Sequence, residues 1–226
     1  MLQESSSPAA RVVPGGTVAG SVLVACGVLA VFAMAHHPSV QSHTPAEVIR
    51  EIGRIGSVSQ VVHAAMIAII AAVMFAFTVF SIRRGLDKQT VLGGLIAQAI
   101  GTAAMIVAAM ISGFVVPAIA ARYASAAPGN LTFAVQIIAI CAGVNEIFAR
   151  LGVIAMSVAI ALWSVDLVLV RGAARIAAIL GFAAGAFGVG VLLFGGHLTP
   201  LVFGTIVLGQ AIWYCAVGAL LIRRTL

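Results

Sequence analysis

The chain has 226 residues, of which 62% are hydrophobic and only 8% are charged, and its mean hydropathy is +1.20. Soluble domains contain about 25% charged residues, and disordered chains combine low hydrophobicity with high charge, so this composition excludes both classes. The formal net charge is +6, but the basic residues lie between apolar runs. In that position they set topology and attract anionic lipid, so we expect a lipid bilayer as the surroundings and no nucleic-acid partner.

Six apolar stretches follow a polar segment over residues 1–15, which we expect to be a mobile cytoplasmic tail. Each stretch is long enough to cross the membrane as a helix, which needs about 20 residues, whereas the strands of an outer-membrane barrel need only about 10. The sequence therefore predicts an all-α fold, with a single six-helix transmembrane domain over residues 16–226. The predicted spans are 16–35, 57–82, 90–121, 130–170, 173–194 and 200–222.

The distribution of lysine and arginine predicts the orientation of these spans. If the N-terminus is cytoplasmic, eight basic residues lie in inner segments and three in outer loops, an excess typical of the positive-inside rule. Both termini are then cytoplasmic, and we expect a multi-pass protein of the cytoplasmic (inner) membrane. The eight inner residues are Arg11, Arg83, Arg84, Lys88, Arg171, Arg175, Arg223 and Arg224, and the three outer ones are Arg50, Arg54 and Arg122.

The first outer loop contains a helix start signal. Thr44-Pro45-Ala46-Glu47 is a capping box with proline at the first helical position. The apolar residues that follow share one helix face, and the charged residues share the other. We therefore expect a short amphipathic helix over about residues 45–55, which lies on the outer surface as an interfacial anchor or as a lid over an outer cavity.

The third and fourth stretches are longer than a membrane crossing requires. They are joined by residues 126–130, Ala-Ala-Pro-Gly-Asn, which form a turn signal with Asn130 as the expected N-cap. One interpretation is a helical hairpin that projects past the outer interface. The other is a break near Gly143, which would make residues 131–143 a separate interfacial helix.

Several ionisable side chains lie at one predicted depth, and such groups in membrane spans mark functional sites by default. We count about 1.5 Å per residue from the predicted cytoplasmic helix ends. On this scale His36 and His63 lie roughly 30 and 28 Å up their helices, and Arg150 and Glu146 roughly 30 and 36 Å. His197 follows the outer end of the fifth stretch, and all five histidines of the chain lie on this side. Separate elements therefore bring these groups to the outer, periplasmic interface.

This level is where the sequence predicts a transition-metal site. Imidazole is the commonest ligand of transition metals, and carboxylate complements it for copper, zinc or iron. The expected ligands are His37, His63 and Glu146, with His36 and His197 as alternates.

Haem is the alternative cofactor at the same level. His63 and either His36 or His37 would be its axial ligands. Arg150 or Arg54 would neutralise the propionates, whereas in a metal site Arg150 would hold Glu146 or an anionic ligand. A purely structural alternative also exists, because histidines are tolerated at a membrane interface where the ring reaches water.

Two carboxylates of the fourth stretch have basic neighbours. Glu146 and Arg150 are four residues apart, a spacing that allows them simply to pair with each other. Asp166 lies near the predicted cytoplasmic end, where we expect it to pair with Arg171.

Small or polar residues recur every seven positions in the fourth stretch, which places them on one helix face. This pattern is typical of helix–helix hydrogen bonding, and it also fits a small transporter or channel with a polar pathway. The residues are Gln136, Gly143, Arg150, Ser157 and Ser164, with Asn145 and Glu146 beside them.

Glycines form small-residue faces on two other stretches, a feature of close helix packing in membranes. Such faces serve packing within the chain, or contact with a second copy or other membrane helices, as in a non-catalytic assembly protein. They comprise Gly94 and Gly101 in the third stretch and Gly181, Gly185 and Gly188 in the fifth. No motif identifies a substrate, so the sequence leaves open whether the protein is an enzyme.

The N-terminal region has a second interpretation as a signal peptide. Arg11, the apolar run and Ala33-Met34-Ala35 resemble such a peptide with its cleavage site, and cleavage would leave His36 as a copper-chelating N-terminus. The apolar run is longer than that of a usual signal peptide, so we expect a retained helix, and an intact mass of the uncleaved chain would confirm it.

Overall fold

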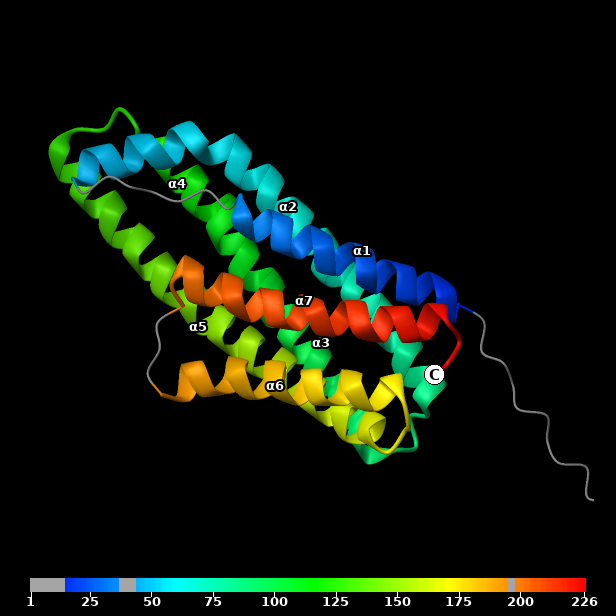
Figure 1. Ribbon diagram of the computed structural model, residues 1–226. Helices are drawn as coiled ribbons and strands as arrows, with labels where there is room; N and C mark the ends of the chain where they lie inside the picture. The colour runs from blue at the N-terminus through cyan, green and yellow to red at the C-terminus, as the bar shows by residue number, and fades with distance from the viewer. Residues whose placement is uncertain (1–14, 37–43, 195–197) are drawn as a thin grey trace, which may run out of the picture.

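The computed structural model describes residues 15–36, 44–194 and 198–226, and every regular element within them is a helix (Figure 1). Six helical stretches in this part of the chain are long and apolar enough to cross a membrane. The chain is therefore a multi-pass membrane protein, and the predicted six-helix bundle is confirmed. The predicted tail lies outside the described residues except for Gly15.

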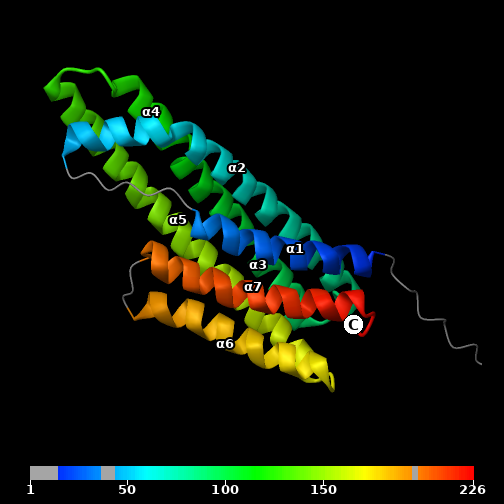
Figure 2. The same ribbon diagram turned by 45° about the horizontal axis from the view of Figure 1, so that its top comes forward.

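Three spans have about the length of one bilayer crossing: α1 (Gly16–Ala35), α6 (Ala173–Leu193) and α7 (Pro200–Ile222). Three others are longer: α2 (Pro45–Arg84), α5 (Pro128–Val168), and the run of α3 (Gln89–Met110), the π-helix η1 (Ile111–Val115) and α4 (Val116–Tyr123). A helix of 40 residues is about 60 Å long, roughly twice the hydrocarbon thickness. Figures 1 and 2 show that the long helices continue together past one end of the short ones.

Apolar clusters hold this arrangement together. The main core lies among the spans, where the ring of Phe77 stacks on Trp163 and Trp213 with centroids 4.5 and 5.3 Å away. A smaller cluster, of Ile49, Ile52, Ala120 and Ala134, joins α2, α4 and α5 in the part that continues past the short helices. Burial of this cluster stabilises the extension as a small three-helix unit.

The amphipathic segment over residues 45–55 is the first part of α2 and does not form a separate helix. Its predicted start is confirmed, because the Thr44 side chain accepts a hydrogen bond from the backbone N–H of Glu47. Its predicted end near residue 55 is wrong, because α2 continues without a break to Arg84. Ile49 and Ile52 are buried against α4 and α5, and this packing carries the helix through Gly56 into the membrane span.

The connection between the third and fourth spans is a helical hairpin, as one of the two interpretations predicted. α5 runs from Pro128 to Val168 without interruption at Gly143, so a separate helix over 131–143 is wrong. The expected N-cap is also wrong, because Ala127 occupies that position and Pro128 is the first helical residue. Proline suits the first turn, where its missing N–H has no partner to lose.

Close helix contacts are made through glycine. A Cβ at Gly20 of α1 would lie 2.5 Å from the carbonyl oxygen of Gly218 of α7, so α1 is an integral part of the bundle. A Cβ at Gly185 of α6 would lie 2.8 Å from the carbonyl oxygen of Ser157. The predicted glycine faces therefore serve packing within the chain. Gly181 faces Ser164 and Trp213, and both Gly185 and Gly188 face Ser157. Gly94 faces Trp163, and Gly101 faces Met156.

One end of the bundle contains the start of α1, the end of α7 and the α2–α3 and α5–α6 turns (Figure 1). Asp166 is almost fully buried there and pairs with Arg84 at 2.5 Å and Lys88 at 2.9 Å. The predicted pairing of Asp166 with Arg171 is wrong. The chain reaches Arg171 only after α5 has ended, whereas the α2–α3 turn lies beside the last turns of α5.

Candidate functional site

A cavity of about 300 Å³ lies where the long helices pass the ends of α1 and α7. This volume is in the range of small-ligand sites. We call it the His–Glu cavity, after His63 of α2 and Glu146 of α5, which both line it. Its other principal residues are Met34 of α1, Met66 of α2, Met105 of α3, Ser112 of η1, Asn145 of α5 and Phe203 of α7.

His63 is a buried imidazole with a defined orientation, and only 3% of its surface is exposed. Its Nδ1 lies 2.7 Å from the backbone carbonyl oxygen of Ser59. A carbonyl only accepts, so Nδ1 is the protonated nitrogen, and the lone pair of the neutral ring lies on Nε2. The same device, a ring N–H donated to a backbone carbonyl, orients histidine ligands in metal sites.

The π-helix η1 packs directly against His63. A Cβ at Gly113 would lie 2.6 Å from Cγ of the imidazole, so only glycine leaves room for the ring. Ser112 and His63 also line a neighbouring cavity of about 210 Å³. π-Helical turns are rare and frequently occur at functional sites. This element was not predicted from the sequence. Pro117 is a signal for it, because proline cannot donate a hydrogen bond to the carbonyl of Gly113 and so disturbs the helix geometry.

Glu146 is held at the cavity by Arg150. The Nε and Nη2 atoms of Arg150 lie 3.0 and 2.7 Å from Oε1 of Glu146. The predicted pairing across four residues is therefore confirmed, and both side chains are partly exposed. This ion pair restrains the carboxylate of Glu146 on α5.

The remaining predicted site residues do not join this pair in the described structure. His36 is exposed at the end of α1, where its Nδ1 lies 2.9 Å from the carbonyl oxygen of Phe32, and it does not line the cavity. Arg54 is exposed on α2 and is not among the residues of the cavity. His37 and His197 lie outside the described residues. Within the described ranges, no three His, Cys, Asp or Glu side chains form a group that could hold a metal ion.

The polar stripe of α5 divides into different environments. Gln136 is exposed, whereas Ser157 and Ser164 are fully buried. Ser157 accepts a hydrogen bond from Nε2 of Gln210 at 3.4 Å, and Ser164 donates to the carbonyl oxygen of Ile160 at 2.7 Å. Ser157 and Ser164 therefore make hydrogen bonds within the helix packing, and they do not line the His–Glu cavity.

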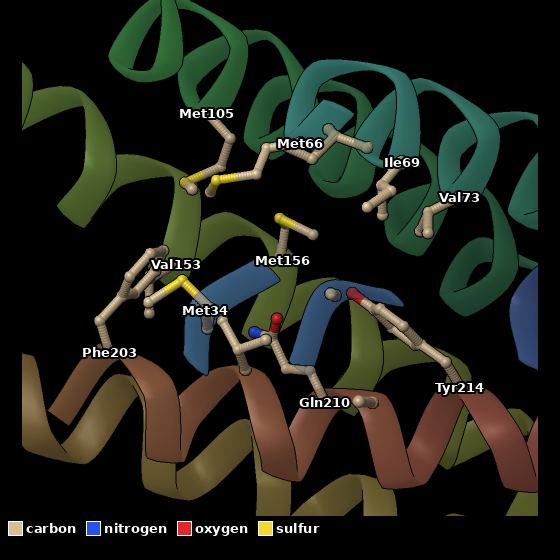
Figure 3. A pocket seen from close by; sticks show the side chains of 14 residues that line it. Met34, Met66, Ile69, Val73, Met105, Val153, Met156, Phe203, Gln210 and Tyr214 are labelled. Carbon is tan, nitrogen blue, oxygen red and sulfur yellow. The ribbon is translucent and has the colours of Figure 1, made fainter. Parts of the chain in front are cut away.

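A second, smaller space of about 70 Å³ adjoins the His–Glu cavity. We call it the methionine chamber, because Met34, Met66, Met105 and Met156 line it, and the first three also line the His–Glu cavity. Figure 3 shows these side chains converging from separate helices, with Gln210 and Tyr214 of α7 on the side opposite Met66 and Met105. The chamber could not be predicted from the sequence, because methionine in an apolar helix has no distinctive pattern.

Comparison of the chain with protein-family models, with curated proteins and with solved structures finds no match. A six-helix membrane bundle does not by itself specify a function. The chemistry of the His–Glu cavity and of the methionine chamber is therefore the basis for a functional proposal.

Proposed function

We propose that the protein binds a transition-metal ion in the His–Glu cavity, with Nε2 of His63 and the carboxylate of Glu146 as ligands. The supporting observation is the state of His63. It is buried in a membrane-spanning helix, its Nδ1–H is fixed on the Ser59 carbonyl, and it shares a cavity with a carboxylate. Burial of a polar group in a membrane is costly, and ligation of an ion offsets that cost.

The donor set fits this chemistry. Imidazole and carboxylate together suit copper, zinc or iron, and the wider cavity leaves room for water or an exogenous ligand on the ion. Arg150 fixes one carboxylate oxygen of Glu146, as outer-shell partners of metal ligands commonly do. Haem is a weaker fit, because His63 is the one described histidine that lines the cavity.

We further propose that the cavity lies toward the periplasmic side of the cytoplasmic membrane. The basic residues Arg83, Arg84 and Lys88 lie at the other end of α2 and in the α2–α3 turn. Basic residues favour the cytoplasmic side, and the end of the bundle with the cavity then faces outward.

The test is the metal content of detergent-purified protein, measured by elemental analysis together with an absorption spectrum. We expect near-stoichiometric copper, zinc or iron in the parent chain and loss of most of it in His63→Asn and Glu146→Gln. His36→Ala is the matched control, because His36 is exposed and outside the cavity, and it should keep the metal. Unchanged content in both cavity variants would overturn the proposal.

A further inference from the structure

We infer that the bound ion is Cu(I), held where the His–Glu cavity meets the methionine chamber by the thioether sulfurs of Met34, Met66 and Met105 together with His63. This inference rests on the proposed function, since it names the ion and adds ligands to the same site.

The first support is the convergence of these methionines. Met34, Met66 and Met105 belong to α1, α2 and α3, and each lines both spaces. Their side chains, with that of Met156, extend into one common space in Figure 3. His63 and Met66 are three residues apart on α2, so both project from the same helix face.

The second support is that the chamber remains open. Methionine is flexible and usually fills irregular gaps in a core. Here four methionines surround a space of about 70 Å³, although one water-sized probe needs only about 10–15 Å³. Most of the other lining residues are aliphatic or aromatic, among them Ile69, Val73 and Phe203, and such a lining gives water few partners.

The third support comes from Tyr214. Its hydroxyl is buried, has no hydrogen-bond partner among the described residues, and is directed into the chamber in Figure 3. An unsatisfied buried hydroxyl is costly, so this group indicates that the chamber holds a small polar or charged species in contact with it. A cation fits that role, because the lone pairs of the hydroxyl oxygen can face it. That observation is independent of the methionines, which indicate the chemistry of the ligand.

Ligand softness selects the ion. Thioethers are soft ligands that favour Cu(I), and imidazole also suits copper. Zinc in protein sites instead takes imidazole, carboxylate and thiolate ligands. A single positive charge is also less costly to bury than a divalent ion, and the carboxylate of Glu146 on the same cavity offsets that charge.

The test is Cu(I) affinity of the full chain in detergent, under anaerobic conditions with ascorbate, in competition with a chromophoric Cu(I) chelator. Ag(I), which is redox-inert, serves as a second probe. We expect Met66→Leu and Met105→Leu each to weaken binding at least about tenfold, because leucine replaces the volume but not the sulfur. X-ray absorption of the Cu(I) form should show sulfur neighbours.

Met110→Leu is the matched control, since Met110 is exposed on α3 and lies outside both spaces. It should bind Cu(I) as the parent chain does, and all three leucine variants should keep the parent melting temperature. If Met66→Leu and Met105→Leu bind Cu(I) normally while His63→Asn loses its metal, this inference is overturned and the proposed function stands. If His63→Asn and Glu146→Gln also keep their metal, both are overturned.

Discussion

The imidazole of His63 occupies the space that a side chain at position 113 would need. A Cβ on Gly113 would lie 2.6 Å from Cγ of His63, closer than real Cβ atoms approach their neighbours. The π-helical turn at Ile111–Val115 presents this glycine to α2. The position of the predicted ligand is therefore fixed from two sides, by the Ser59 carbonyl on its own helix and by the backbone of η1.

Replacement of Gly113 by alanine should displace the His63 ring. The added methyl group would push the imidazole away from the Ser59 carbonyl, and a ligand moved by even 1 Å loses productive geometry. We expect Gly113→Ala to lose most of its bound metal while the purified protein remains helical. Elemental analysis and circular dichroism measure the two properties.

Gly143→Ala is the control for that experiment. Gly143 lies on α5, near Glu146, and a Cβ there would meet nothing within 4 Å. This variant should keep both its metal and its fold. Equal metal content in Gly113→Ala and Gly143→Ala would show that the contact with His63 does not position the ring.

The glycines of α6 provide a test of helix packing. A Cβ at Gly185 would lie 2.8 Å from the carbonyl oxygen of Ser157, whereas one at Gly190 would meet nothing within 4 Å. Gly185→Ala should destabilise the bundle by about 1–3 kcal/mol through overpacking. Gly190→Ala should be neutral or stabilise by up to about 1 kcal/mol, because alanine favours helix. Thermal unfolding in detergent compares them, and equal melting temperatures would contradict the close packing of α5 and α6.

The membrane spans could be predicted from sequence because span length and hydrophobicity are local properties. The predicted 16–35 agrees with α1, and the Thr44 cap is where the motif placed it. Continuity was harder to predict. Whether the segment before Gly56 ends or continues depends on the burial of Ile49 and Ile52 against α4 and α5, which no local pattern encodes.

The site could be predicted only in part. The common depth of His63 and Glu146 follows from helix rise, and the structure places both on one cavity. The partner of Asp166, the π-helix beside His63 and the methionine chamber depend on how separate helices pack. Met34, Met66 and Met105 are distant in sequence and resemble ordinary apolar residues, so only their convergence distinguishes them.

The carboxylate of Asp166 should stabilise the end of the bundle that contains the start of α1 and the end of α7. It pairs with Arg84 and Lys88, whose side chains are 15% and 45% exposed, while its own is 5% exposed. Asp166→Asn should lower the free energy of unfolding by about 2 kcal/mol. This is less than the loss expected when a fully buried ion pair is broken, because water still reaches the two cations. Lys88→Ala should lower the free energy of unfolding by less than about 1 kcal/mol, since Lys88 is the more exposed partner. The melting temperatures in detergent check this order, and a larger loss in Lys88→Ala would contradict it.

The orientation of the bundle can be tested by labelling single cysteines in intact cells. The background chain lacks Cys26, Cys141 and Cys215, and one cysteine is introduced at Asn130 or at Asp87, which are both exposed. Asn130 lies at the start of α5, on the end with the long-helix extension, and Asp87 lies in the α2–α3 turn beside the basic residues. Because lysine and arginine favour the cytoplasmic side, a membrane-impermeant maleimide should label Asn130→Cys from outside and Asp87→Cys only after permeabilisation. The opposite labelling pattern would invert the topology and place the His–Glu cavity on the cytoplasmic side.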